Sequence, residues 1–287
     1  MNGMTEDIAL VTDSTCDVPA ELLEQYNIIV QPHVIIWGQE QFRDRVDLLP
    51  EDFYRRLGSS TIHPTTSQAT IHDFAGTFRA ACQQGAREIV AIIVSGALSG
   101  AMQSVINAAK ETPVPVHIHD SRQASMGLGW QVLAAARARA AGGGAAEMLA
   151  AADQVRQKMQ LIIYLDTLEY LYRGGRIGNA RRMIGAMLNI KPLIAVDHDS
   201  GLVEPVGAAI TRKRGIDQVL HQFFAKVDPA RPLRVAVLHG DAAPDAERLL
   251  EHIRENYHPV ELLTNITTPT LGIHTGPRAV ALAGYSE

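Results

Sequence analysis

The sequence predicts an α/β protein with two domains: an N-terminal three-layer α/β/α domain with a mostly parallel sheet, and a C-terminal two-layer α/β domain. In the first half, short apolar runs, polar loops and helical patterns follow one another repeatedly, as in parallel strands joined by helices. After about residue 160 this order changes, and a hairpin pattern surrounds Asp199-Ser200-Gly201. We therefore expect domains at 1–159 and 160–287.

In the first half, strands are predicted where apolar residues run together: Ile8–Val11, Ile28–Trp37, Ile89–Val94 and Val114–His119. A first helix is expected after a cap at Thr15 or Asp17, with Pro19 in its first turn. Further helices are predicted at Pro50–Leu57, Ile71–Gln83, Ala101–Ala109 and Trp130–Ala141, and another follows the break at Gly142–Gly144 and runs to about Met159.

In the second half the predicted elements are shorter and more varied. Strands are expected at Leu161–Leu165, Arg234–His239 and Val260–Asn265, with a hairpin at Val196–Pro205. Helices are expected at Thr167–Tyr172, Ala180–Leu188, Arg214–Ala225 and Asp245–Glu255, and a late polar loop at His274–Pro277.

Composition excludes several classes of protein. The 287 residues carry a net charge of −5, so no overall basic field favours nucleic acid or anionic lipid. The longest apolar runs have the length of strands, which predicts no integral membrane contact. The start of the chain lacks the pattern of a secretory signal. With two cysteines and no disulfide framework or metal motif, we expect a cytoplasmic protein without metal or cofactor.

Two hydroxyl-rich segments precede predicted helices. Pro64-Thr65-Thr66-Ser67-Gln68 and Ser95-Gly96-Ala97-Leu98-Ser99-Gly100 could bind an anion, because free N–H groups and the helix dipole favour negative charge there. Both segments could equally be ordinary helix caps. The second is neither a GxSxG elbow nor a phosphate-binding P-loop.

Three further segments carry polar chemistry. Asp120-Ser121 leads to Gly127-Leu128-Gly129, but this lacks the third glycine and the acidic residue of a dinucleotide site. Gly174-Gly175-Arg176 could pair with a carboxylate or phosphate, or form a solvated turn. His274-Thr275-Gly276-Pro277 could bind an anion or act as an acid or base, although a lone histidine is more often structural.

The order of these motifs is more specific than any one of them. Along essentially the whole chain, the sequence resembles the DegV family of bacterial fatty-acid-binding proteins. The resemblance rests on Thr12–Thr15, PTTSQ at 64–68, LSG at 98–100, DSxxxSxGxG at 120–129, GGRI at 174–177 and HTGP at 274–277.

The resemblance implies a protein that binds a long-chain fatty acid between its two domains and is not itself an enzyme. It implies carboxylate ligands at Thr66 and Ser99, with Arg176 or His274 supplying positive charge. It also implies a partner, an ATP-binding fatty acid kinase to which the acid is presented for conversion to acyl phosphate. Supporting positions in the same loops are Thr65, Ser67, Ser95, Gly100, Asp120, Ser121 and Gly175.

The chain departs from the family pattern at several positions. Near the expected head group, Gly96, Ala69 and Ala101-Met102 replace residues that are common in the family. Ile210 and Arg278 also differ from the common residues, and these two differences put the kinase partnership in doubt. A hydrolase or phosphotransfer enzyme using Ser99 or His274, assisted by Asp120 or Asp13, is the alternative. The spacing reveals no set of nucleophile, base and orienting residue that would favour it.

Overall fold

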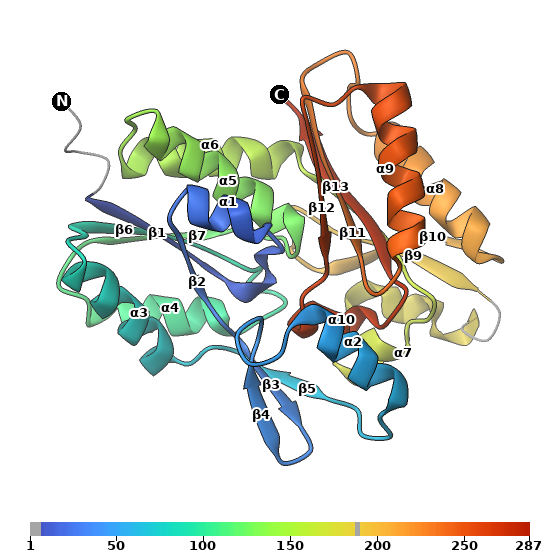
Figure 1. Cartoon of the computed structure of the whole chain (residues 1–287), viewed down its shortest axis with the longest axis horizontal. Helices are drawn as coiled ribbons and strands as arrows, with labels where there is room; N and C mark the ends of the chain where they lie inside the picture. Colours follow the sequence, from blue (N-terminus) through green and yellow to red (C-terminus); the bar gives the residue numbers. More distant parts are fainter. Residues whose placement is uncertain (1–6, 187–189) are drawn as a thin grey trace.

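The computed structural model describes residues 7–186 and 190–287, and its first sheet lies in the N-terminal half (Figure 1). This sheet has the strand order β2-β1-β6-β7, and its neighbouring strands are all parallel. The four strands are β1 (Ile8–Asp13), β2 (Ile28–Gln31), β6 (Glu88–Ile93) and β7 (Val116–Asp120). The predicted parallel sheet is confirmed.

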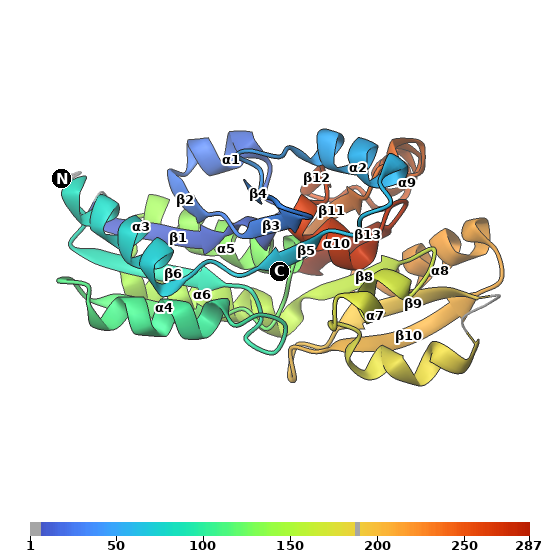
Figure 2. The same ribbon diagram turned by 90° about the horizontal axis from the view of Figure 1, so that it is seen from below.

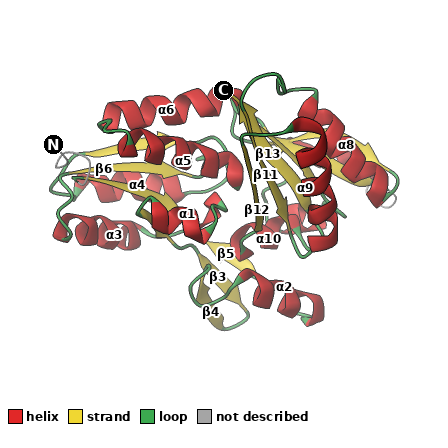
Figure 3. Ribbon diagram, turned by 45° about the horizontal axis from the view of Figure 1, so that its top comes forward, coloured by secondary structure: helices red, strands yellow, loops and turns green. Residues whose placement is uncertain are grey.

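Helices cover both faces of this sheet, which gives the three layers expected (Figures 1 and 3). On one side lie α5 (Met126–Ala140) and α6 (Ala145–Lys158), and on the other α3 (Ile71–Gln83) and α4 (Ala101–Lys110); α1 (Ala20–Gln25) packs beside β2. Sequence explains the start of α3, where Thr70 and Asp73 form a reciprocal capping box.

A small antiparallel sheet projects from this half, at the bottom of Figure 1. It has the order β4-β3-β5, and along the chain α2 lies between β4 and β5. The bounds are β3 (Val34–Trp37), β4 (Glu40–Arg43), α2 (Pro50–Ser59) and β5 (Thr65–Ser67). The prediction of one strand over Ile28–Trp37 was therefore wrong. Pro32 separates β2 from β3, because proline has no N–H to continue a ladder.

The C-terminal half forms a six-stranded mixed sheet with the order β10-β9-β8-β13-β11-β12. Its strands are β8 (Gln160–Tyr164), β9 (Lys191–Val196), β10 (Val203–Ala209), β11 (Leu233–His239), β12 (Glu261–Ile266) and β13 (Val280–Ser286). α8 (Arg212–Phe224) and α9 (Ala243–Tyr257) cover one face, so the two-layer expectation is confirmed. β10 and β9 form one edge of this sheet (Figure 2), and the turn between them reaches the N-terminal half, where Arg122 donates to the carbonyl of Asp199 at 2.6 Å.

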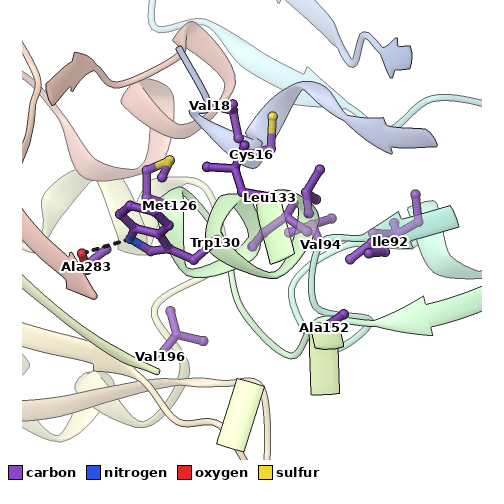
Figure 4. Close-up of a cluster of buried hydrophobic side chains, with 14 of the residues drawn as sticks. Cys16, Val18, Ile92, Val94, Met126, Trp130, Leu133, Ala152, Val196 and Ala283 are labelled. Carbon is purple, nitrogen blue, oxygen red and sulfur yellow. Dashed lines mark hydrogen bonds between the residues drawn. The ribbon is translucent and has the colours of Figure 1, made fainter. Parts of the chain in front are cut away.

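The other face of the C-terminal sheet packs against the N-terminal half. α5 contacts β8 and β13 as well as β1 and β6, so one helix lies between the two sheets. Its Trp130 is fully buried, and the indole N–H donates to the carbonyl of Ala283 on β13 at 3.1 Å (Figure 4). Val94 and Val196, from opposite halves, belong to the same apolar cluster. The main core is therefore shared by the two halves.

The sequence predicted the presence of helices better than the residues at which they begin. α1 has no side-chain cap; Asp13 instead caps a short 3₁₀ helix over Ser14–Cys16, and Asp17 follows it in the left-handed region. α5 begins at Met126, so the expected loop continuing to Gly129 was wrong. A side chain at Gly129 would collide with the carbonyl of Cys16, its Cβ lying 2.4 Å away, so this glycine serves close packing of the helix.

Two corrections concern the C-terminal half. The expected α-helix over Ala180–Leu188 is a 3₁₀ helix over Gly178–Ala186, and the end of that prediction lies outside the described residues. The expected polar loop at His274–Pro277 is wrong as well, because α10 (Pro269–Thr275) includes His274. The remaining short helix is α7 (Glu169–Arg173).

Candidate functional site

One partly enclosed cavity runs between the two halves, with about 950 Å³ of empty space including its opening to solvent. Much of its wall is apolar and buried. The apolar lining includes Val94 after β6, Leu161 and Ile163 on β8, Ile194 and Val196 on β9, Val203 on β10, Leu238 on β11, and Val280 and Ala281 at β13.

The four residues predicted to bind a carboxylate all line this cavity: Thr66, Ser99, Arg176 and His274. They come from β5, the loop before α4, the loop after α7, and α10. All four are half-buried, in contrast to the apolar wall. The cavity therefore has a polar region near the surface and an apolar region in the core.

His274 is joined directly to Thr66, since its Nε2 lies 3.0 Å from the Thr66 hydroxyl. Its other nitrogen, Nδ1, is buried and has no hydrogen-bond partner among the described residues. Burial, then the nearby Arg176 and His63, lower the pKa of His274 to about 4. With this pKa the imidazole is neutral at pH 7, so positive charge at the site comes from Arg176.

Arg176 is held by backbone carbonyls. Its Nε donates to the carbonyl of Leu98 at 3.2 Å, and Nη1 donates to the carbonyl of Gly174 at 2.8 Å. A guanidinium has five donor hydrogens and stays charged at physiological pH, so donors remain for an anion. The contact with Leu98 also ties Arg176 to the loop that carries Ser99.

The loop Ser95–Gly100 is fixed by the supporting residues predicted around it. The Ser95 hydroxyl donates to the carbonyl of Gly201 at 2.8 Å, across the two halves. The Gly96 N–H donates to Asp120 at 3.3 Å, and the Ala101 N–H donates to the Ser99 hydroxyl at 3.2 Å. Ser95 and Asp120 thus hold the backbone around Ser99 and do not line the cavity.

The other supporting residues divide between the cavity and its surroundings. Ser67 lines the cavity, whereas Thr65 is exposed on β5. Ser121 is buried and donates to the carbonyl of Gln123 at 3.1 Å. Gly100 and Gly175 are not part of the lining; Gly175 adopts a φ of +69° in the turn before Arg176, a conformation that glycine adopts easily.

Several polar residues of the cavity were not predicted. They are His33, Thr267 and Thr270, whereas Thr15, Gln68, Ser125 and Thr275 were named only as parts of motifs. Thr270 lies four residues before His274 on α10, so helical spacing would have found it if that segment had been recognised as a helix. His33 gave no signal, because its apolar neighbours suggested an ordinary strand.

Comparison with known proteins places the chain in a family. Residues 7–287 match the family model described as "Uncharacterised protein, DegV family". The chain belongs to the DegV family. A DegV domain-containing protein from Streptomyces coelicolor is 33% identical over 276 residues, which are 96% of each chain.

Solved structures of the DegV family have the same fold. A DegV family protein from Thermus thermophilus, described by its fatty acid binding, is 31% identical with a TM-score of 0.91, covering 98% of this chain and 100% of that one. DegV of Bacillus subtilis, described as a fatty acid binding protein, has a TM-score of 0.89 at 24% identity, covering 98% and 99%. The second likeness shows the fold alone.

The described part of the chain has neither a cluster of metal ligands nor a helix that could span a membrane. There, no three His, Cys, Asp or Glu side chains gather as metal ligands. Over the same residues, no helix has both the length and the apolar character that crossing a bilayer requires.

Proposed function

We propose that this protein binds a long-chain fatty acid, with the tail in the apolar part of the cavity and the carboxylate at Thr66 and Ser99. The observation that carries the proposal is the cavity itself, in which a buried apolar wall leads to half-buried hydroxyls and a guanidinium. The DegV protein from Thermus thermophilus, described by its fatty acid binding, supports the same ligand class. The two halves, 1–159 and 160–287, would act as domains that enclose the lipid.

Physical estimates agree with tight binding. A tail of about fifteen methylenes would contribute roughly 12 kcal/mol, at about 0.8 kcal/mol per group, before the losses of freedom on binding. The carboxylate needs compensation, because an unpaired buried charge is very unfavourable. Each hydroxyl would contribute a charge-assisted hydrogen bond of about 1.5–3 kcal/mol, and Arg176 would balance the charge.

The contact between His274 and Thr66 would orient the Thr66 hydroxyl. A neutral imidazole carries one N–H, and placing it on Nε2 lets His274 donate to the Thr66 oxygen. The Thr66 hydrogen is then free to point at the fatty acid carboxylate. Nδ1 is then an acceptor, and no donor of the described residues contacts it.

We also propose that the bound acid is presented to an ATP-dependent fatty acid kinase and that this protein carries out no chemistry itself. The half-buried head-group residues would leave the carboxylate within reach of a partner. The geometry does not favour the hydrolytic alternative, because His274 contacts Thr66 and no hydrogen bond joins it to Ser99 or to a carboxylate among the described residues. Asp13 and Asp120, the proposed assistants, hold backbone and hydroxyl groups elsewhere.

The first test is a fatty acid titration of the protein and of the Thr66→Ala, Ser99→Ala double variant, after mass spectrometry of lipids extracted from the purified protein. We expect a co-purifying C14–C18 acid and a loss of affinity of at least about 10-fold in the variant, because two charge-assisted hydrogen bonds are removed. Thr65→Ala, next to the site but exposed, is the matched control. Equal affinity in all three proteins would refute the assignment of Thr66 and Ser99 as carboxylate ligands.

The proposed presentation of the fatty acid to a kinase is tested separately. Purified fatty acid kinase and ATP should form acyl phosphate from the loaded protein, and no product should form without the kinase. Ile210 is 72% exposed, and the Arg278 side chain is 58% exposed although it pairs with Asp166 at 3.4 Å. Both are therefore surface positions where substitutions can alter kinase docking. Hydrolysis of esters or phosphates by the protein alone would refute the non-enzymatic proposal.

A further inference from the structure

The turn between β9 and β10 joins the C-terminal half to loops of the N-terminal half that border the cavity (Figure 2). β9 and β10 form an edge of their sheet, and the last residue pair before the turn, Val196 and Val203, lines the cavity. The turn therefore lies beside the proposed fatty acid site, although none of its own residues is a proposed ligand of the carboxylate.

Hydrogen bonds within the turn maintain its shape. The Asp197 carboxylate accepts the N–H groups of Asp199 at 3.2 Å and Ser200 at 2.7 Å. The Asp197 carbonyl accepts the N–H of Gly201 at 2.7 Å. Because these contacts are local, the turn is preorganised, and its other carbonyl groups are left as acceptors for neighbouring segments.

Four side chains of the N-terminal half donate to backbone carbonyls of this turn. The pairs are Ser95 to Gly201 at 2.8 Å, Gln123 to Val196 at 3.0 Å, Arg122 to Asp199 at 2.6 Å and Arg156 to His198 at 3.3 Å. The contacts from Ser95 and Gln123 are buried, where a hydrogen bond is stronger than it is in water. The turn is therefore held in a defined position against the N-terminal half.

Ser95 connects this turn to the loop that carries Ser99. Its hydroxyl oxygen accepts the N–H of Ala97 at 3.2 Å, and its carbonyl accepts the N–H of Ser99 at 3.1 Å. Its one hydroxyl hydrogen is donated to the carbonyl of Gly201. The C-terminal half thus orients the Ser95 side chain, and the backbone around Ser99 is bonded to the same residue.

The turn approaches Ser95 so closely that position 201 requires a glycine. Gly201 has a φ of +69°, in the left-handed region that glycine adopts easily. A Cβ at this position would lie 2.2 Å from the Ser95 hydroxyl oxygen and 3.5 Å from the Cα of Arg122. A larger residue would therefore displace the Ser95 hydroxyl and break its contact with the turn.

We propose that Gly201 and Ser95 are positioning residues for Ser99. The docked β9–β10 turn holds the loop Ser95–Gly100 in the conformation in which the Ser99 hydroxyl donates to a fatty acid carboxylate. A ligand supplied by the N-terminal half then depends on a turn of the C-terminal half. This inference rests on the proposed fatty acid site and adds the residues that set its geometry.

The test measures the head-group contribution to binding separately from the tail contribution. Hexadecanoate and 1-hexadecanol have tails of the same length, but only the first has a charged head group. Competition against one fluorescent fatty acid gives both affinities for the delipidated parent, Ser95→Ala and Gly201→Ala. In both variants the ratio of acid to alcohol affinity should fall about 3- to 10-fold, because the charge-assisted hydrogen bond of Ser99 is weakened.

Gly38→Ala is the control for backbone strain. Gly38 has a φ of +66° in the β3–β4 turn, and its Cβ would lie 3.5 Å from Ile62, an ordinary contact distance. This variant should keep the ratio of the parent even if left-handed strain lowers its stability. Ser95→Ala removes the same contact as Gly201→Ala without added bulk or strain, so it carries the test if Gly201→Ala does not fold.

A double-mutant cycle shows whether Ser95 acts through Ser99. In a Ser99→Ala background, Ser95→Ala should lower the ratio by a smaller factor than in the parent, because the hydroxyl that it positions is absent. An equal factor in both backgrounds would overturn the proposal. An unchanged ratio in Ser95→Ala would overturn it too, including the case in which acid and alcohol lose affinity equally through a purely structural effect.

Failure of the underlying site gives a different result. A parent protein that binds the acid and the alcohol equally well would refute the head-group site, and one that binds neither would refute the proposed function.

Discussion

At the scale of single residues, the charge of the cavity depends on Arg176, while His274 acts through its hydrogen bond. Burial and the neighbouring Arg176 keep His274 neutral, with its pKa lowered to about 4. Arg176 keeps its charge and is oriented by two backbone carbonyls. The two residues lie in the same site but contribute different interactions to a bound anion.

This difference predicts unequal effects of matched substitutions. At pH 7, Arg176→Gln should weaken fatty acid binding by about 10- to 100-fold, because a charged hydrogen bond and the balancing charge are lost. His274→Gln removes a neutral contact and should weaken binding by about 10-fold or less. Titration calorimetry of both variants measures the difference. A larger loss for His274→Gln would contradict the assignment of charge.

At the scale of elements, the loop after α7 and helix α10 fit together through glycine. Gly174 packs against His274, and a Cβ on Gly174 would lie 2.1 Å from Nδ1 of that ring. The backbone there has ordinary helical angles, so an alanine would be strained by this contact and not by its own φ and ψ. The glycine therefore leaves space for the imidazole that orients Thr66.

Gly174→Ala should displace the ring of His274 and weaken fatty acid binding by about 10-fold, as if the contact with Thr66 were lost. Gly76→Ala is the control, because its Cβ would meet no atom within 4 Å in helix α3. That control should keep full affinity and gain about 0.5–1 kcal/mol of stability. Titration and thermal unfolding of both variants test this. Unchanged binding in Gly174→Ala would show that the ring position is not critical.

At the scale of the whole molecule, Asp17 connects segments that are far apart in sequence. Its carboxyl accepts the Ser125 hydroxyl at the start of α5 and the Thr268 N–H before α10, at 2.6 and 2.9 Å. Asn265 donates to the Asp17 carbonyl at 2.9 Å. Burial raises the pKa of Asp17 to about 7, with these hydrogen bonds opposing the shift.

The raised pKa of Asp17 predicts a pH dependence of stability. The folded state holds this proton more tightly than the unfolded state, so the stabilisation is full below about pH 4 and is lost as the pH rises to about 7. The change could reach about 4 kcal/mol, at 1.36 kcal/mol for each pH unit. Urea unfolding at several pH values between 4 and 8 measures it.

Asp17→Asn tests whether this residue is the origin. The asparagine oxygen can accept the Thr268 N–H and its amide NH2 can donate to the Ser125 oxygen, so both contacts are kept without a charge. The variant should match the parent near pH 4 and be more stable at pH 8. Asp217→Asn, an exposed carboxylate on α8, should behave like the parent at both values. If Asp17→Asn loses stability with pH as steeply as the parent, another group is responsible.

Sequence patterns were sufficient where local physics decides the structure. The helix predicted over Ile71–Gln83 matches α3 to the residue, and the capping box of Thr70 and Asp73 in the structure shows that local contacts define its start. The run Ile89–Val94 predicted the buried strand β6 nearly as well. Local patterns misled where packing overrides them. Gly127 and Gly129 suggest a loop, but both lie in α5, and Gly129 is needed there because the helix approaches the Cys16 carbonyl closely.

By itself, the sequence determined the α/β class, the parallel first sheet, and the ordered motifs that resemble the DegV family. Each depends on residues close together in the chain, or on motif order, so one sequence contains the information. The tertiary structure decided that Thr66, Ser99, Arg176 and His274 line one cavity, and that His274 is neutral there. Distances between segments and the burial of a charge are properties of the packed chain, and no local pattern carries them.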